Sequence, residues 1–134
     1  MKHLEVVAAA IEYEHKILCL QRGQAKYPYI SYKYEFPGGQ VEPGEGRAEA
    51  LNRELCEELD LQVKIKEEDY LLTVEHTYPD FKVTLHLFHC PVATSAFALK
   101  EHMAFQWLPV AEMQQLDWVE ADKPLVELLQ QKIK

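Results

Sequence analysis

The chain has 134 residues, of which 48% are hydrophobic and 27% charged, a length and composition that fit one compact domain over residues 1–134. The formal net charge of −8 argues against a general nucleic-acid binder, which needs a basic surface to displace counterions from phosphates. A nucleotide substrate is compatible with that charge, because a bound divalent cation reverses the local sign.

Cysteine usage and the N-terminus indicate a reduced, cytoplasmic protein. The chain has an odd number of cysteines, Cys19, Cys56 and Cys90, and no Cys-x-x-Cys pair. This argues against a disulfide framework or a thiolate zinc site. Met1 to Val7 lacks the features of a signal peptide, and no apolar run approaches the ~20 residues of a membrane span. We expect no membrane partner, and either a monomer or a homodimer.

The first third of the chain is predicted to form strands around a polar loop. Leu4–Ile11 and Ile17–Leu20 are apolar runs joined by a polar turn, the pattern of a strand pair. Gly23–Lys33 is a loop in which Tyr27, Tyr29 and Tyr32 either stack on a base or pack against the protein. Tyr34–Phe36 is a further short strand.

A glycine-rich loop then leads into one helix. Pro37–Gly46 contains four of the five glycines of the chain, which predicts a structured loop. Arg47–Leu59 contains neither Gly nor Pro and predicts a helix. Its buried stripe, at helical spacing, is formed by Ala48, Leu51, Leu55 and Leu59.

The remainder of the chain alternates between strands and short helices. The predicted strands are Tyr70–Thr77, Phe81–Val92 and Ala104–Leu108, with a hairpin at residues 78–80 and a loop over Thr94–Met103. The predicted helices are Pro109–Leu116 and Asp122–Lys134, the latter with Leu125, Leu128, Leu129 and Ile133 facing inward. This order of elements predicts an α+β sandwich with a mixed β-sheet.

Three carboxylates in the central helix are the strongest chemical signal. Glu54, Glu57 and Glu58 occupy positions i, i+3 and i+4, which lie within about 100° of one another on a helix. Taken alone, they fit a solvated acidic face, because Glu is common on helix surfaces. Next to a glycine loop they also fit a Mg²⁺ site, because Mg²⁺ prefers carboxylate oxygens and keeps waters that phosphate can replace.

The loop and the helix together resemble a known family. Residues 39–61, GQVEPGEGRAEALNRELCEELDL, match the Nudix box at every defined position except Asp60, where the family has Gly. We expect a left-handed backbone there, which Asp tolerates better than most residues. The resemblance implies the Nudix fold, an α/β/α sandwich with a central mixed β-sheet.

Segments outside the box extend the resemblance to MutT-like members. YEFPGG at 34–39 is similar to the approach to the box, and Glu75–Leu87, with Tyr78-Pro79-Asp80, is similar to the central hairpin. Ala121–Pro124 is similar to the entry to the last helix. Leu4–Ala10 resembles the N-termini of bacterial CTP pyrophosphohydrolases. The implied activity is Mg²⁺-dependent hydrolysis of a nucleoside triphosphate to the monophosphate and pyrophosphate, with Mn²⁺ as a substitute ion.

The resemblance also assigns roles to residues of the box. It implies that Glu54, Glu57, Glu58 and the Gly38 carbonyl bind the metal and that Glu54 also activates the water. Arg53 would hold the glutamates in position without touching substrate. Glu45 would fix the loop or Arg53 from behind, and Gly39 would allow close approach of the backbone.

Four residues outside the box are further candidates, each with a structural alternative. Glu101 falls where MutT-like enzymes carry an additional metal ligand or base, and otherwise is a surface residue. Arg22 contacts phosphate or base, or forms a surface salt bridge. Phe36 packs beside the base, or belongs to the core. Asp122 reads the base, or caps the last helix, where Asp is a favoured N-cap.

Several functions follow from these residues. A carboxylate at Asp122 accepts hydrogen bonds from an exocyclic amine, which favours CTP, dCTP or a modified cytosine nucleotide. The alternatives are an 8-oxo-dGTP or other oxidised-nucleotide diphosphatase, a hydrolase of ADP-ribose or dinucleoside polyphosphates, and a non-catalytic nucleotide sensor. We expect His76, His86 and His89 to be exposed strand residues and not a second metal site.

Overall fold

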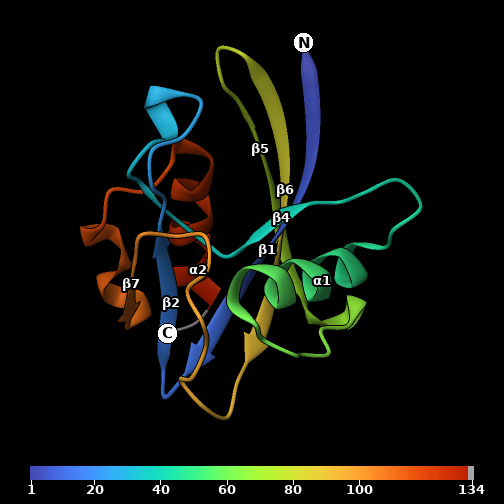
Figure 1. Cartoon of the computed structure of the whole chain (residues 1–134). Helices are drawn as coiled ribbons and strands as arrows, with labels where there is room; N and C mark the ends of the chain where they lie inside the picture. Colours follow the sequence, from blue (N-terminus) through green and yellow to red (C-terminus); the bar gives the residue numbers. More distant parts are fainter. Residues whose placement is uncertain (133–134) are drawn as a thin grey trace.

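A computed structural model describes residues 1–132, in which a mixed β-sheet lies between two α-helices (Figure 1). The strands are β1 (Lys2–Tyr13), β2 (Lys16–Gln21), β3 (Tyr34–Glu35), β4 (Gly38–Gln40), β5 (Tyr70–Thr77), β6 (Phe81–Pro91) and β7 (Ala104–Leu108). The helices are α1 (Arg47–Leu59) and α2 (Lys123–Lys132), with short 3₁₀ turns η1 (Pro28–Ile30), η2 (Glu67–Asp69), η3 (Val110–Gln115) and η4 (Glu120–Asp122). The predicted α+β fold with a mixed sheet is confirmed.

Strand β1 is the centre of the sheet. It runs parallel to β6 over residues 2–12, and β5 pairs antiparallel with β6 beyond it. On its other edge β1 pairs antiparallel with β4 at Val6–Ala8 and with β2 only at Glu12 and Tyr13. The segment Pro37–Gly46, expected to be entirely loop, therefore contributes a short strand, because Gly38 and Gly39 can lie directly against β1.

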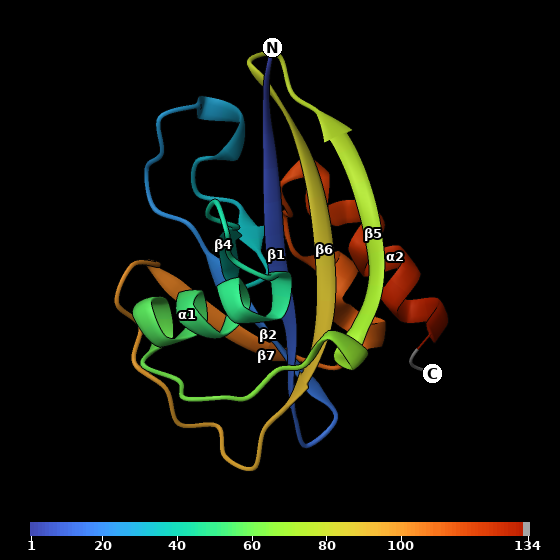
Figure 2. The same ribbon diagram turned by 90° about the vertical axis from the view of Figure 1, so that its right-hand side faces the viewer.

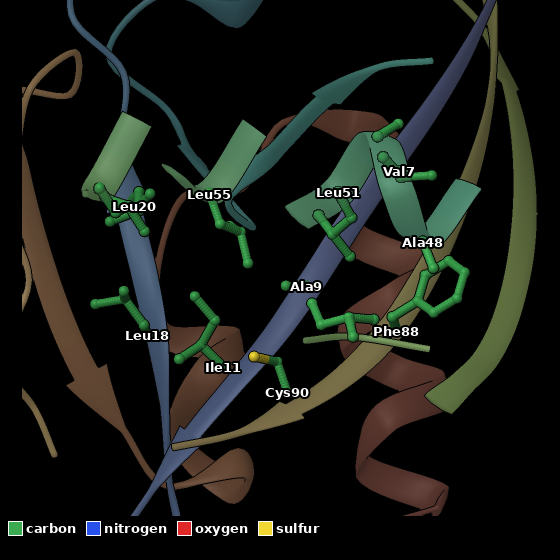
Figure 3. Packing of buried hydrophobic residues seen from close by; sticks show 13 residues of the cluster. Val7, Ala9, Ile11, Leu18, Leu20, Ala48, Leu51, Leu55, Phe88 and Cys90 are labelled. Carbon is green, nitrogen blue, oxygen red and sulfur yellow. The ribbon is translucent and has the colours of Figure 1, made fainter. Parts of the chain in front are cut away.

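Alternate residues of β1 face two separate cores. Val7, Ala9 and Ile11 pack against α1, as Figure 3 shows, while Ala8 and Ala10 belong to the core below α2. Figure 2 shows α1 and α2 on opposite sides of β1 and β6. Both faces of a covered strand must be apolar, which explains the uninterrupted run of small and branched residues in β1.

The bounds of α1 agree with the prediction, and all four residues of its predicted stripe are buried. Leu51 and Leu55 are fully buried, and each contributes roughly 1.5–3 kcal/mol of transfer free energy. The helix ends at Asp60, whose φ of 56° and ψ of 32° are left-handed as predicted. At the other end, Glu67 accepts a 3.0 Å hydrogen bond from Ala48 N, which compensates for the absence of a capping side chain at Gly46.

Helix α2 differs in phase from the prediction. Leu125 and Leu129 are buried, but Leu128 is 37% exposed and Val126 takes its place in the core. Ile133 lies outside the described residues. The expected helix at 109–116 is the 3₁₀ segment η3. No helix within residues 1–132 has the length and apolar character needed to cross a membrane.

The prediction for the strand histidines was wrong for His86. His86 is 3% exposed, because β6 is an inner strand of the sheet. Both nitrogens of its ring have hydrogen-bond partners. Nδ1 lies 2.7 Å from Thr73 Oγ1, and Nε2 lies 3.2 Å from Glu5 Oε1. His86 is thus a buried, hydrogen-bonded core residue, and the other two strand histidines are partly exposed.

Candidate active site

A cleft of about 580 Å³ opens beside β1 and β4. Carboxylates from α1 and aromatic rings from the first loop and the β5–β6 hairpin line it, together with basic and aliphatic side chains. The lining includes Glu54, Glu58, Glu35, Phe36, Asp122 and Arg22. This one cavity therefore gathers most of the candidates that lie far apart in the sequence.

Two consecutive glycines bring the backbone close to these carboxylates. Gly38 has a φ of +154°, and a Cβ there would lie 2.0 Å from the Val7 carbonyl oxygen on β1. A Cβ on Gly39 would lie 2.3 Å from Cδ of Glu54. The Gly38 N–H donates a 3.3 Å hydrogen bond to Glu58 Oε1. The glycines thus permit contact between β1, β4 and the acidic face of α1.

Arg53 organises the acidic side chains of the box. Its Nε donates to Glu45 Oε2 at 2.7 Å and its Nη2 to Glu45 Oε1 at 3.0 Å, a two-pronged ion pair. Its Nη1 donates to Glu54 Oε1 at 2.9 Å and reaches Glu57 at 3.4 Å. The Arg53 guanidinium lowers the pKa of Glu45. Glu45 and Arg53 accordingly lie behind Glu54, at the distances a supporting role requires.

The loop that carries Glu101 is attached to the C-terminal end of α1. Ala98 N donates to Leu59 O at 2.9 Å and Lys100 N donates to Glu58 O at 3.2 Å, which satisfies carbonyls that the helix itself leaves unpaired. Glu101 is exposed. Burial is the main cause that raises the pKa values of Glu54 and Glu58, and the charge of Glu101 adds to it. The loop therefore brings a fourth carboxylate within electrostatic range of two of the three in α1.

Glu35 was not identified from the sequence, although it lies within YEFPGG. Its carboxylate accepts hydrogen bonds from Arg22 Nη1 at 3.1 and 3.3 Å and lies 2.8 Å from Nε2 of His102. Arg22 thus forms the salt bridge that was its structural alternative, yet it also lines the cleft. The signal available in the sequence was a charged residue inside a predicted short strand, Tyr34–Phe36, directly before the glycine-rich loop.

Phe36 and Asp122 lie together at the base of the cleft. Phe36 is 3% exposed and its ring stacks on Trp118 at 5.0 Å, so it belongs to the core while lining the cleft. Asp122 is 5% exposed, and its Oδ2 accepts a 2.9 Å hydrogen bond from Phe36 N. This carboxylate oxygen is therefore engaged with the backbone of the residue that follows β3.

The tyrosines of the first loop divide between packing and the cleft. Tyr29 stacks between Tyr27 and Tyr78, with ring centroids 5.3 Å apart on each side, and its hydroxyl donates to Asp80 at 2.7 Å. Tyr27 lines the cleft, whereas Tyr32 is 53% exposed. Packing therefore accounts for Tyr29, whereas Tyr27 both stacks on Tyr29 and lines the cavity.

Comparison with known proteins assigns the family. The NUDIX domain family matches residues 1–129. The chain belongs to the Nudix hydrolases. It is 38% identical to the CTP pyrophosphohydrolase of Escherichia coli K12 over 95% of this chain and 91% of the relative, and 28% identical to the 8-oxo-dGTP diphosphatase of that strain over 96% and 98%. The MutT protein of Methanosarcina mazei Go1 has the same fold, with a TM-score of 0.86 at 23% identity, covering 99% of this chain and 96% of that one.

Nudix hydrolases generally use divalent metals, and the side chains of this cleft fit such an ion. Burial, with Glu35 and Glu54 nearby, raises the pKa of Glu58 to about 8, and burial raises that of Glu54 despite Arg53. Crowded carboxylate oxygens are the donors that a hard cation stabilises. Within residues 1–132 no three His, Cys, Asp or Glu side chains already lie together as a metal-binding cluster, and Arg53 contacts both Glu54 and Glu57.

Proposed function

We propose that this Nudix hydrolase converts a cytosine nucleoside triphosphate, either CTP, dCTP or a modified form, to the monophosphate and pyrophosphate with Mg²⁺. The observation that carries the proposal is the presence of Glu54, Glu58 and Asp122 in a single cleft of about 580 Å³, a volume suited to a nucleotide. The 38% identity to a relative named CTP pyrophosphohydrolase supports the choice of base.

The metal would be held by oxygen ligands from two segments. Glu54, Glu57, Glu58 and the Gly38 carbonyl would bind it from the box, and Glu101 from the loop attached to α1. Mn²⁺, which takes similar ligands, would substitute for Mg²⁺. A bound divalent ion supplies neutralisation of phosphate charge and a lower pKa for an attacking water.

Glu54 is proposed to accept the proton of the attacking water. Burial raises its pKa toward the working pH, which improves a general base. The water oxygen forms a bond to the β-phosphorus, and the bond from that phosphorus to the oxygen bridging to the α-phosphate breaks. The nucleoside monophosphate leaves with that oxygen, and the β- and γ-phosphates leave as pyrophosphate. Arg53 keeps Glu54 oriented through the 2.9 Å contact.

Asp122 is proposed to recognise the base, with Phe36 and Arg22 as neighbours in the cleft. Because Oδ2 is occupied by Phe36 N, Oδ1 is the oxygen that can meet the substrate. An ionised carboxylate accepts a hydrogen bond from the N4 amine of cytosine and repels the O6 acceptor of guanine. Phe36 would contribute to recognition of the base in two ways: its backbone N–H would hold Asp122, and its ring edge would lie beside the base. Arg22 would contact the base or a phosphate.

A second candidate substrate is 8-oxo-dGTP or another oxidised nucleotide. Burial raises the pKa of Asp122 well above its usual value, and the Glu35 carboxylate raises it further. A protonated Asp122 would donate a hydrogen bond, and a carbonyl oxygen on the base would then be the better partner. The 28% identity to a relative named 8-oxo-dGTP diphosphatase is in line with this alternative.

A pyrophosphate-release screen separates these substrates. Canonical, methylated, hydroxylated and oxidised nucleoside triphosphates are compared at equal concentration with Mg²⁺, for the wild-type protein and Asp122→Asn. We expect cytosine nucleotides to rank first and the ranking to change in Asp122→Asn, because an amide presents both a donor and an acceptor. An unchanged ranking would remove Asp122 from base recognition, and a purine in first place would favour the second candidate.

Other readings are tested by the same assay. A non-catalytic sensor would release no pyrophosphate from any nucleotide. Hydrolysis of ADP-ribose or of a dinucleoside polyphosphate yields no pyrophosphate either, so for those compounds the nucleotide products themselves are separated and measured by chromatography. The proposal treats residues 1–134 as one cytoplasmic catalytic domain, acting as a monomer or homodimer on a nucleotide and not on nucleic acid or a membrane.

A further inference from the structure

His102 is a buried side chain next to Glu101 that the proposed reaction does not use. Its side chain is 5% exposed, and its Nε2 lies 2.8 Å from Glu35 Oε2. A carboxylate oxygen only accepts hydrogen bonds, so the ring nitrogen is the donor. The contact joins residues 67 positions apart and connects the loop after β6 with the strand that enters the box.

Three contacts surround Glu101 on its loop. Lys100 N donates to Glu58 O at 3.2 Å on one side, and Met103 N donates to Gln21 O at 3.0 Å on the other. The His102 side chain supplies the third, directly after Glu101 in the chain. These hydrogen bonds of its neighbours hold the backbone of Glu101 in place, while Glu101 itself is exposed.

The partner of His102 is itself held in place. Both oxygens of Glu35 receive hydrogen bonds from Arg22, and Glu35 lines the cleft together with Glu58 and Asp122. Its side chain is 20% exposed, which leaves it few alternative rotamers. A buried donor attached to a fixed acceptor is the arrangement by which outer residues orient a ligand.

We propose that His102 is a positioning residue, whose hydrogen bond to Glu35 holds Glu101 beside Glu54 and Glu58 and so sets the affinity of the site for its divalent ion. The proposal rests on the proposed function for the role of Glu101. His102 does not touch the substrate. It acts by restricting the loop from Leu99 to Met103, and its effect must therefore pass through Glu101.

The first test follows the loop without requiring any turnover. Amide hydrogen exchange over residues 99–103 is compared in the wild-type protein, His102→Leu and His102→Gln, whose amide can still donate to Glu35. We expect exchange to rise about tenfold in His102→Leu and to return toward wild type in His102→Gln. His89→Leu is the matched control, because His89 also pairs with a glutamate, Glu12, at 2.7 Å, but Glu12 does not line the cleft as Glu35 does. Unchanged exchange in His102→Leu overturns the proposal.

The second test is a double-mutant cycle on the Mg²⁺ concentration needed for half-maximal activity. We expect that concentration to rise about 10-fold or more in His102→Leu, with the nucleotide KM changed by less than about twofold. In a Glu101→Gln background, adding His102→Leu should have no further effect. Additive effects would mean that His102 only stabilises the fold. If the wild-type protein hydrolyses no nucleotide, the proposed function fails while hydrogen exchange still decides the role of His102.

Discussion

Gly39 lies against the carboxylate of Glu54 so closely that a Cβ on Gly39 would be 2.3 Å from Cδ and 2.4 Å from Oε2. The observed position of the Glu54 carboxylate in α1 therefore requires a glycine at this place in β4, for steric reasons. A side chain at 39 would push the Glu54 carboxylate out of place while leaving the hydrophobic contacts of α1 intact.

Gly39→Ala is expected to lower kcat/KM by about tenfold or more, because small displacements of a catalytic group are costly. The free energy of unfolding should change by less than about 1 kcal/mol, since the Glu54 side chain can move aside. Gly23→Ala is the control, as a Cβ there meets nothing within 4 Å. Activity close to wild type in Gly39→Ala would show that Glu54 does not need its observed position.

Arg53→Lys is expected to reduce kcat by about 10–100-fold with the charge conserved. Lysine cannot reproduce the two contacts to Glu45 together with the contact to Glu54, because its ammonium is a single point. Arg47→Lys serves as the matched control, since Arg47 makes only a 3.9 Å contact to Glu5 and its side chain is 50% exposed. Equal kinetics for both variants would contradict the positioning role of Arg53.

Asp122 should impose a pH dependence on stability. Burial raises its pKa in the folded protein above the unfolded value of about 3.9, so the folded state binds the proton more tightly. The contribution of Asp122 to the free energy of unfolding is most favourable below its pKa in the unfolded chain. That contribution is lost as the pH rises through its pKa in the folded protein. Asp122→Asn removes this loss and keeps an oxygen for Phe36 N.

Urea unfolding of both proteins at pH 4 and pH 7 measures this effect. We expect the free energy of unfolding of Asp122→Asn, minus that of the wild type, to be larger at pH 7 than at pH 4. Glu58 is present in both proteins, so its contribution cancels in this difference. A relative stability that does not depend on pH would mean that Asp122 titrates normally.

Asp60→Gly is expected to raise the free energy of unfolding by about 0.5–1 kcal/mol. Asp60 ends α1 with a φ of 56°, a conformation that glycine adopts without the steric cost of a Cβ. The 3.9 Å pair with Lys100 is exposed and adds little. Thermal or urea unfolding checks the value, and Asp60→Ala should be destabilised. A loss of stability in Asp60→Gly would indicate that the Asp side chain has a favourable contact.

The features predicted well from sequence are local ones. The bounds of α1, its buried stripe and the left-handed residue at Asp60 follow from helical periodicity and from the spacing of the box, which act over a few residues. The phase of α2 was less well predicted, because Val126 and Leu128 are both apolar and only packing against the sheet decides which of them is buried.

The contacts missed from sequence join distant segments. Glu35 meets His102 across 67 residues and Asp122 meets Phe36 N across 86, and no periodic pattern connects such pairs. The burial of His86 likewise depends on β6 lying between β1 and β5. Residue types at the site could be predicted because their chemistry is restrictive, whereas their partners required the fold.

Phosphorus NMR of the products, with the wild-type protein and Glu54→Gln in the presence and absence of Mg²⁺, tests the central claim most directly. Nucleoside monophosphate and pyrophosphate should form in equal amounts from CTP with Mg²⁺, and Glu54→Gln should lose most of the rate while remaining folded. Products consisting of the diphosphate and inorganic phosphate, or an undiminished rate in Glu54→Gln, would contradict the account.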